Sequence, residues 1–483
     1  MFIVSVSSCD KDEIINTDSS VKLEFSSDTI IFDTVFTTIG STTKKLMVYN
    51  KEKQKIKISS ISLARGQNSP FKINIDGTSA TNINDVEIRG GDSLYIFVCV
   101  TIDPNKDDNP LIQTDSIVFE TNGNLQDVDL VAWGQDANYI TPDTYKEGFP
   151  PYKIIVKENE NITWTNNKPY VVYGYAVVDS TGILNIDEGT KIYFHKNSGL
   201  WVYKGGAIKV NGTIDEPVYF QGDRLEEFYD DLPGQWDRIW LNESSVDNEF
   251  HYAVIKNAFI GIQAETLNSS MGNKLIIENT IIENMTGMGI FSRYYNILSA
   301  NNVISNCGGY NLALTLGGDY DFRHCTFGNF WDYSIRQTPA VYFNNYIEYV
   351  DEYGNISGHD DFDLTKAFFG NCIIYGNNED EIEPDKKYSA QFNYTFDHCL
   401  LKTEKTLSEP NYVECLKNLD PLFTNIDENN FELDTVISPA VDAGSLDVIN
   451  SSILNISKDI KDKNRIFDGK PDLGAYEFFD EDL

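Results

Sequence analysis

The chain is poor in basic residues. Its 483 residues include 38 Lys and Arg against 74 Asp and Glu, which gives a formal net charge of −36 at pH 7. A surface with this acidic excess repels the phosphates of nucleic acids and anionic membrane surfaces, so we expect no nucleic-acid partner. It also repels anionic polysaccharides unless a cation such as Ca²⁺ lies between the two.

The sequence lacks three further patterns. Its seven cysteines show no C-x-x-C spacing, which argues against a structural zinc site. No apolar run is long enough to span a membrane. The apolar positions come in short runs rather than in a ten-residue helical pattern, so strands are expected in place of helices.

A short pattern recurs between residues 254 and 401. Each copy has two β-branched or aromatic runs separated by a polar pair, as in Ile-Ile-Glu-Asn-Thr-Ile-Ile ending at Ile282. The first residue of the pair falls at Asn257, Asn279, Asn301, His324, Asn371 and His398. The spacings are 22, 22, 23, 47 and 27 residues, and we interpret 47 as about two periods with one degenerate copy. A period of this size indicates a repeat architecture.

These residue types favour a parallel β-helix. Asn tolerates the left-handed backbone conformation of a tight bend, and stacked Asn side chains can hydrogen-bond along a column. A small residue follows each anchor and a large apolar residue lies two positions further on, which is the alternation of inward-facing side chains. We interpret Cys325, Cys372 and Cys399 as small buried residues of this kind. A disulfide between Cys372 and Cys399, on adjacent coils, is the alternative.

The stretch before the repeat supports this interpretation. It contains the strings Gly189-Thr-Lys-Ile-Tyr-Phe194, Gly199-Leu-Trp-Val-Tyr203, Gly205-Gly-Ala-Ile-Lys-Val210 and Glu216-Pro-Val-Tyr-Phe220. They resemble the opening coils of bacterial right-handed parallel β-helix proteins of the pectin-lyase-like superfamily. We therefore place a β-helix at residues 139–405. The resemblance implies the fold, whereas a fold does not determine the chemistry of a protein.

Residues 21–138 alternate with the period of β-strands. Short strands at close intervals predict an immunoglobulin-like β-sandwich. The segment also resembles the abnormal-spindle/hydin type of Ig-like domain, through Gly91-Asp-Ser93, Asp103-Pro104 and the closing Val131-Ala-Trp-Gly134. That resemblance implies a spacer or an interaction module. The strands are expected at Val21–Phe25, Leu46–Tyr49, Lys55–Ile58, Phe71–Ile75, Leu94–Val100, Ser116–Phe119 and Val128–Val131.

Residues 406–483 carry two linked motifs. Ser438-Pro-Ala-Val-Asp-Ala-Gly444 precedes Asp472-Leu-Gly-Ala-Tyr-Glu477, and the pair resembles the C-terminal segment of many secreted bacterial β-helix proteins. An open solenoid end exposes a strand edge and an apolar interior, so we expect this segment to be a cap. Arg465 is expected to pair with Asp472 or Glu477. A cation site built from the carboxylates is the alternative.

Residues 1–20 begin with an apolar run that ends in Val6-Ser-Ser-Cys9 and is followed by Asp10-Lys-Asp-Glu13. Small residues before a Cys resemble a bacterial lipobox, and the charged residues after it resemble the surface-export signal of Bacteroidetes lipoproteins. The resemblance implies a lipid on Cys9, a short tether, and a protein held at the surface of the bacterial outer membrane. An apolar stub with a stray cysteine is the alternative.

Two insertions interrupt the repeat, at residues 223–234 and 329–365. Binding surfaces of solenoid proteins form in such loops. Exposed aromatic rings can stack on sugars, and carboxylates can hold Ca²⁺ or sugar hydroxyls. The alternative is that the loops only cover the side of the helix. The candidate ligand-binding residues are Trp236, Trp240, Trp331, Tyr333, Tyr349, Asp351, Asp360, Asp361 and Asp363.

A catalytic site is the less favoured interpretation. Relatives of this fold include pectate lyases, which need a basic residue and a cation, and hydrolases, which need two carboxylates about 5–10 Å apart. His359-Asp360-Asp361 resembles a hydrolase cluster, but the Asn-x-Asp and Arg-x-Lys strings expected around it are missing. No shared face is evident for the basic candidates, which are Arg238, Lys256, Arg293 and Arg323.

We therefore predict an all-β protein with an Ig-like β-sandwich, a right-handed parallel β-helix and a C-terminal cap. The expected function is that of a lipid-anchored surface protein that binds a polysaccharide or another glycan, or a host or matrix surface in the manner of an adhesin, without catalysis. A polysaccharide lyase or glycoside hydrolase on the same fold is the second hypothesis, and a purely structural stalk is the third. Ca²⁺ is the one cofactor considered.

Overall fold

The computed structural model describes residues 14–36, 40–102, 111–242, 245–266, 274–408, 410–434, 437–467 and 469–479. The chain divides into two compact units, Met1–Ala137 and Asn138–Leu483. The lipidation candidate Cys9 lies outside the described residues. Within the described part of the chain, no helix is both long and apolar enough to cross a membrane.

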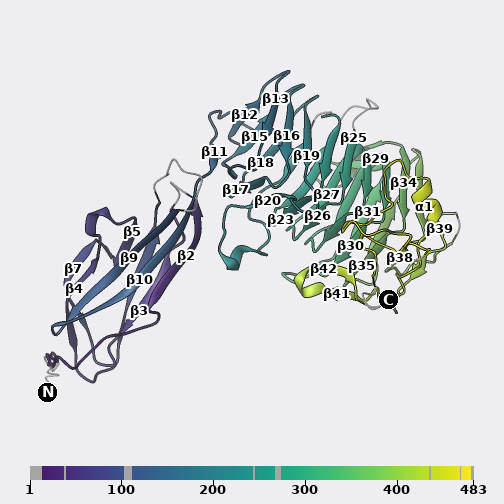
Figure 1. Cartoon of the computed structure of the whole chain (residues 1–483). Helices are drawn as coiled ribbons and strands as arrows, with labels where there is room; N and C mark the ends of the chain where they lie inside the picture. The colour runs from purple at the N-terminus through teal and green to yellow at the C-terminus, as the bar shows by residue number, and fades with distance from the viewer. Residues whose placement is uncertain are drawn as a thin grey trace, which may run out of the picture. The chain divides into compact units, whose positions relative to one another are not determined.

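The N-terminal unit is a sandwich of two five-stranded sheets (Figure 1). The first sheet has the order β1 (Glu24–Phe25), β3 (Lys44–Tyr49), β8 (Ser93–Val100), β5 (Phe71–Ile75) and β6 (Thr78–Ser79). The second has the order β2 (Thr29–Phe36), β10 (Asn124–Gln135), β9 (Leu111–Thr121), β4 (Ile56–Leu63) and β7 (Asn82–Ile88). Neighbouring strands run antiparallel, except that β2 runs parallel to β10. A 3-10 turn, η1 (Gly66–Asn68), follows β4.

Alternating apolar side chains form the core of this sandwich. Ile56, Ile58 and Ile61 of β4 are fully buried and belong to one cluster with residues from both sheets. The predicted Ig-like β-sandwich is confirmed. The sequence did not predict β7, because Asn82–Ile88 is mostly polar and is held as a strand by its pairing with β4.

The C-terminal unit is a parallel β-helix with three faces. The first and second faces together form a 17-stranded sheet, and the third face is an 11-stranded sheet. The third face contains β11 (Asn138–Ile140), β14 (Tyr170–Val172), β17 (Lys191–Phe194), β20 (Val218–Gly222), β23 (Ala253–Lys256), β26 (Ile281–Glu283), β28 (Val303–Ser305), β30 (Thr326–Asn329), β35 (Ile373–Gly376), β38 (Leu400–Leu401) and β40 (Leu416–Lys417).

The two remaining faces share two long strands, β27 (Met288–Ala300) and β29 (Leu312–Arg323). The first face also contains β12 (Tyr152–Val156), β15 (Tyr175–Val178), β18 (Gly199–Val202), β21 (Ile239–Leu241), β24 (Ile260–Glu265), β31 (Val341–Asn344) and β36 (Ile382–Asp385). The second face also contains β13 (Asn161–Trp164), β16 (Ile183–Asp187), β19 (Ala207–Asn211), β22 (Asn248–His251), β25 (Lys274–Glu278), β34 (Leu364–Gly370), β37 (Phe392–Asp397) and β39 (Tyr412–Val413).

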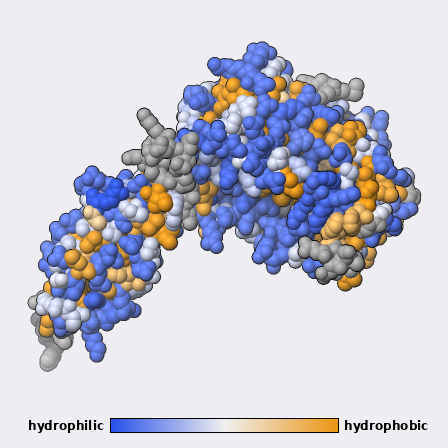
Figure 2. Space-filling view, in the orientation of Figure 1, coloured by the Kyte–Doolittle hydropathy of each residue, from blue (hydrophilic) through white to orange (hydrophobic). Residues whose placement is uncertain are grey.

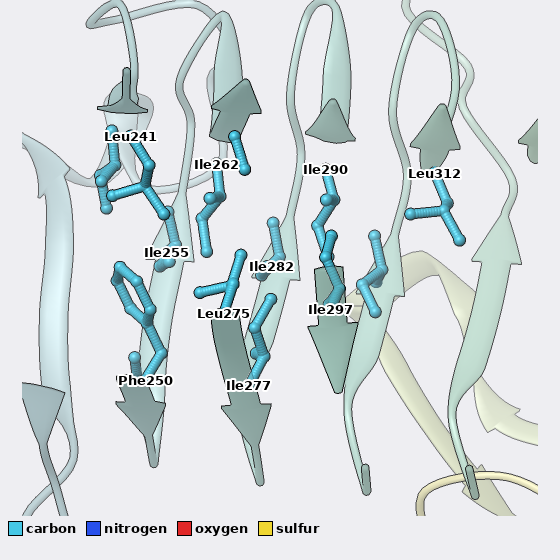
Figure 3. Close-up of a cluster of buried hydrophobic side chains, with 14 of the residues drawn as sticks. Leu241, Phe250, Ile255, Ile262, Leu275, Ile277, Ile282, Ile290, Ile297 and Leu312 are labelled. Carbon is cyan, nitrogen blue, oxygen red and sulfur yellow. The ribbon is translucent and has the colours of Figure 1, made fainter. Parts of the chain in front are cut away.

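Stacked aliphatic side chains fill the interior of the coils. Figure 3 shows Leu241, Ile262, Ile290 and Leu312 projecting inward from successive coils of the first face. All four are fully buried. Each such side chain contributes about 1.5–3 kcal/mol through burial, and repetition along the axis makes this the main source of stability. The surface is mostly hydrophilic, with scattered apolar patches (Figure 2).

Bends at the corner between the second and third faces follow the predicted pattern. Asn279, Asn301, His324, Asn371 and His398 all adopt the left-handed conformation, with φ between 49° and 55°. The Asn301 amide donates to Asn279 Oδ1 at 3.0 Å, and the Asn371 amide nitrogen lies 2.9 Å from His324 Nε2. The predicted column of stacked polar side chains is confirmed at these positions.

Asn257 lies at a different corner, so its assignment to that column is wrong. The strand register places Asn257 beside Asn284, whose amide donates to Asn257 Oδ1 at 2.7 Å. In the column at the corner between the second and third faces, the residue that precedes Asn279 is Tyr252, whose φ is 46°. The corner between the third and first faces therefore has its own asparagine column, which continues to Asn306.

The 47-residue interval between His324 and Asn371 is a single coil. β30 pairs directly with β35, and β29 pairs directly with β34. The additional residues leave the coil at 330–340 and 345–363, and the second excursion contains a hairpin of β32 (Tyr346–Val350) and β33 (Ile356–Asp361). The expected degenerate copy is wrong, because these excursions lengthen one coil to about twice the usual period.

The C-terminal segment extends the helix and then packs on the outer side of the third face. β39 and β40 form a last coil, and a hairpin of β41 (Phe423–Asn425) and β42 (Asn430–Leu433) follows, with η3 (Ile426–Glu428) between them and α1 (Leu446–Asn450) after it. In Figure 1 the hairpin lies beside β30 and β35. Buried Arg465 pairs with Glu477 at 3.4 Å and donates to Asn301 Oδ1 at 2.9 Å. This contact ties the segment to the column of polar side chains at the corner between the second and third faces.

Candidate functional site

A pocket of about 320 Å³ lies at the corner between the third and first faces. Both insertions border it, since residues 223–234 connect β20 to β21 and residues 330–340 connect β30 to β31. We call it the corner pocket. Its lining consists of Asp231, Asn284, Asn306, Phe330, Trp331, Asp332, Tyr333, Asn377, Ile426, Asp427 and Asn429.

The asparagine column at the corner between the third and first faces, which contains Asn257 and Asn284, positions the first insertion. A 3-10 turn, η2 (Glu227–Tyr229), is followed by backbone carbonyls that face the coil corner. The Asn257 amide donates to the Asp230 carbonyl at 2.7 Å, and the Asn284 amide donates to the Asp231 carbonyl. The same side chains that stabilise the bends therefore hold the loop that supplies one wall of the pocket.

Two aromatic residues of the second insertion form another wall. Trp331 is 8% exposed and lies against Gly308, where an added Cβ would come within 3.0 Å of the ring. Tyr333 is 54% exposed, and the two ring centroids are 5.0 Å apart. The Tyr333 hydroxyl donates to the Asp231 carbonyl at 2.7 Å. Tyr333 thus joins two insertions that are about a hundred residues apart.

The lining is acidic. Asp231, Asp332 and Asp427 are exposed, and Lys256 Nζ lies 3.7 Å from Asp231 Oδ1. Glu283 neighbours Lys256 on the next strand. Burial raises the pKa of Glu283 to about 7, and the charges of Lys256 and Asp231 act on it in opposite directions. The pocket therefore offers carboxylate acceptors and amide groups beside aromatic rings.

A second polar cluster lies on the outer side of the first face. Trp201 and Trp240 are in register on adjacent strands and stack with centroids 5.0 Å apart. The Trp240 indole N–H donates to Glu265 at 2.8 Å, and the Asn242 amide donates to the same oxygen at 2.9 Å. Burial raises the pKa of Tyr175, and the nearby negative charge of Asp237 raises it further. The Tyr175 hydroxyl donates to Asp237.

Two arginines belong to this cluster, which we call the outer-face network and define as Asp237, Arg238, Trp240, Gln263, Glu265 and Arg293. Arg238 donates to Asp237 at 2.9 Å and also to Gln263 Oε1. Gln263 donates to Glu265 at 3.2 Å, and Arg293 lies 3.7 Å from the same carboxylate.

The expectation that the basic candidates share no face is therefore wrong for Arg238 and Arg293. Equivalent positions on coils of unequal length cannot be aligned from one sequence. Lys256 lies instead on the third face, and Arg323 lies on the second face with its guanidinium paired to Asp321 at 2.7 Å.

Trp236 faces the core rather than a ligand. It is 2% exposed and stacks on Phe194 with a centroid distance of 4.3 Å. Its indole N–H donates to the Lys256 carbonyl at 2.9 Å. The ring closes the interior next to the first insertion, so it has no surface to offer to a sugar.

The remaining candidates lie in or beside the β32–β33 hairpin and do not converge. Asp351 accepts from two backbone amides of its own turn, and Asp360 accepts from the Tyr349 hydroxyl at 2.6 Å. Asp361 accepts from the Ala390 amide at 2.7 Å, which lowers the pKa of Asp361. Asp363 accepts from a further backbone amide at 2.8 Å.

A Ca²⁺ site does not fit these carboxylates, because each is turned toward a different backbone or hydroxyl partner. Across the described ranges, no three His, Cys, Asp or Glu side chains gather with the geometry of a metal site. Of the nine candidate ligand-binding residues, the structure brings Trp331 and Tyr333 into the corner pocket and Trp240 into the outer-face network.

Three faces of parallel strands wound around one interior define the class of parallel β-helix proteins. Residues 156–241 of this chain match the family described as the pectate-lyase like beta helix domain. The matched part runs from the end of β12 to the end of β21 and includes Trp201 and Trp240. No curated protein sequence matches the chain.

Similarities to solved structures are remote. A family 123 glycoside hydrolase from Clostridium perfringens is 10% identical, with 25% of this chain aligned to 30% of the enzyme at a TM-score of 0.19. A human ASH/PapD-like domain is 11% identical over 28% of this chain and 96% of the domain, with a TM-score of 0.17. The periplasmic chaperone SfaE is 13% identical over 25% of this chain and 61% of the chaperone, also at 0.17.

Proposed function

We propose that the protein binds a polysaccharide or another glycan in the corner pocket, without catalysis. The observation that carries the proposal is the combination of the Trp331 and Tyr333 rings with asparagine amides and carboxylates in one pocket of about 320 Å³. Small-molecule sites combine apolar rings with a few oriented polar groups, and this volume lies at the lower end of their range.

The chemistry of the lining suits sugars. The exposed face of Tyr333 can stack on a sugar ring, while Asn377 and the Asp332 and Asp427 carboxylates can hydrogen-bond hydroxyl groups. The acidic lining disfavours a polyuronate, because like charges would be brought together in a partly desolvated pocket. We therefore expect neutral glycans to bind best.

A tyrosine substitution tests this function. Tyr333→Ala removes the exposed ring and is expected to weaken glycan binding about five- to tenfold, measured by calorimetry against a panel of polysaccharides and oligosaccharides. Tyr353→Ala is the matched control, because this residue is 80% exposed in the β32–β33 hairpin, away from the pocket. Equal affinity of the two variants would overturn the pocket as the binding site. No binding to any glycan would favour the purely structural stalk.

The second candidate function is a polysaccharide lyase or glycoside hydrolase that acts at the outer-face network. The observation that favours it is that Arg238 and Arg293 converge on carboxylates of one face. Against it, Glu265 already accepts from Trp240, Asn242 and Gln263. Incubation with the same polysaccharides would release reducing ends or unsaturated, ultraviolet-absorbing products if this function is correct, and Arg293→Ala would abolish their release.

The proposal includes a lipid on Cys9 and a position at the surface of the bacterial outer membrane. The support is the run of small residues that precedes Cys9 and the charged residues that follow it. Mass spectrometry of the protein purified from its native membrane is expected to find a diacylglyceryl group on Cys9. Recovery of an unmodified Cys9 in that membrane fraction would overturn lipid anchoring, and the glycan experiment would be unaffected.

A further inference from the structure

We propose that Cys399 and Cys415 form a disulfide that fastens the last coil of the β-helix, through exchange with a disulfide-bearing oxidant of the cell envelope. The two residues end a column of four thiols, Cys325, Cys372, Cys399 and Cys415, which in this structure are all free. This inference rests on the envelope location given under the proposed function and does not depend on glycan binding.

The strand register defines the column. The residues on either side of Cys325 pair with those on either side of Cys372, and Cys372 is related to Cys399 in the same way. The pairs Asp397–Val413 and Leu400–Leu416 bracket Cys399 and Cys415. The four cysteines therefore occupy the same corner position on four consecutive coils.

Hydrogen bonds confirm this stacking. The Cys372 amide donates to Cys399 Sγ at 3.4 Å, so these side chains face the same interior column. The Cys399 thiol donates to the Phe369 carbonyl of the preceding coil at 3.2 Å, and the Cys415 thiol donates to the Phe396 carbonyl at 3.4 Å. Neighbouring in-register strands are about 4.8 Å apart, which lies inside the Cα separation of disulfides.

Accessibility selects the pair at the end of the column. Cys325, Cys372 and Cys399 are fully buried, whereas Cys415 is partly exposed. The neighbouring Cys399 thiol also holds the pKa of Cys415 below its ordinary value, while burial raises that of Cys399. Cys415 is therefore the thiol of the column that an external disulfide can reach, and its lowered pKa favours the reactive thiolate.

The exchange consumes one oxidant molecule. The Cys415 thiolate attacks one sulfur of the oxidant RSSR, which forms a mixed disulfide and releases RS⁻. The Cys399 thiolate then attacks Cys415 Sγ, forms the Cys399–Cys415 bond and releases the second RS⁻. The two protons lost by the cysteines are taken up by the two RS⁻ groups, so that two cysteine thiols are oxidised and RSSR is reduced to two RSH.

The last coil is where a crosslink has most effect. β39 and β40 each pair with the preceding coil through only two residues, Tyr412–Val413 and Leu416–Lys417. The disulfide would close a loop between positions 399 and 415, a separation of 16 residues. Closing a loop of this length is expected to lower the equilibrium constant for opening of the last coil by a factor on the order of 100.

Peptide mapping tests the pairing directly. The purified full chain is incubated under native conditions with oxidised glutathione, its remaining thiols are alkylated, and trypsin is added. Cleavage after Lys387, Lys402, Lys405 and Lys417 places Cys399 and Cys415 in separate peptides. The expected result is a disulfide-linked pair of peptides 388–402 and 406–417, together with about 100-fold slower deuterium exchange at 412–417.

Three results would overturn the proposal. All four column thiols are found alkylated, so that no disulfide has formed; Cys415 carries only glutathione; or Cys372 and Cys399 are linked instead. Cys415→Ser should leave Cys399 fully alkylated. Cys99→Ser is the matched control, because Cys99 is also partly exposed but belongs to the N-terminal unit, and it should leave the link intact. The mapping of the unmutated chain keeps the test decisive if Cys415→Ser fails to fold.

Discussion

Arg336 and Glu381 form a buried ion pair in which the guanidinium Nη1 donates to Glu381 Oε2 at 2.8 Å. Neither side chain is more than 2% exposed. Glu381 also accepts from the backbone N–H of Ala340 at 2.8 Å and from the backbone N–H of Asn378 at 2.9 Å. The pair therefore fixes the excursion at residues 330–340, whose first four residues line the corner pocket, to the following coil.

Removal of this carboxylate should be costly. Glu381→Ala leaves the Arg336 charge buried without its partner, which is expected to lower the free energy of unfolding by about 3–5 kcal/mol. Urea denaturation followed by tryptophan fluorescence measures the change. Lys458→Ala is the control, because its pair with Asp462 is exposed, and its effect should stay below about 1 kcal/mol. Similar losses in both variants would contradict the anchoring role of the buried pair.

Glu283 is expected to make stability depend on pH. Burial raises its pKa from 4.5 to about 7 in the folded protein, so the folded state binds a proton more tightly than the unfolded state. The stabilising contribution of protonated Glu283 is therefore fully present below about pH 4.5 and is lost as the pH rises through 7.

Glu283→Gln tests this dependence, since the amide cannot ionise. The free energies of unfolding of the unmutated chain and the variant are measured by urea titration at pH 5 and pH 8. They should differ most at pH 8, where the variant is the more stable by about 1–3 kcal/mol. An equal difference between the two proteins at both pH values would refute the assigned pKa.

Asn371 connects a bend to the C-terminal segment. Its amide donates to the Ser445 carbonyl at 2.9 Å, its Oδ1 accepts from the Ser445 amide at 2.8 Å, and its φ is 52°. Asn371→Ala should cost about 2–4 kcal/mol, through lost hydrogen bonds and backbone strain. Limited proteolysis within 437–467 should become faster, whereas Asn393→Ala on the exposed second face should leave the rate unchanged.

Gly328 permits a close contact between the third face and the C-terminal hairpin. An added Cβ would lie 2.2 Å from the ring of Phe431, which is 1% exposed on β42. Gly328→Ala should therefore displace the β41–β42 hairpin and raise deuterium uptake in 423–433. Gly358→Ala is the control, because its Cβ would meet Tyr349 at an ordinary 3.8 Å. Unchanged uptake in the first variant would show that the hairpin is held by other contacts.

Much of the fold was predictable because its signals are local. Asn279, Asn301 and Asn371 stand where the chain must take a left-handed bend, and the residues after them alternate inward as a strand requires. The candidate site was less predictable. Trp331 and Tyr333 were identified from their place in an insertion, but nothing in the order of residues indicated that Asp231 would lie beside Tyr333.

The sequence by itself determined a β-sandwich followed by a parallel β-helix, since backbone preference and side-chain alternation are properties of neighbouring residues. The tertiary structure alone decided that Asn257 belongs to the other corner and that Arg238 and Arg293 share one network. These relationships depend on which residues of successive coils lie side by side. Insertions of unequal length set that register, so it emerges only when the coils are stacked.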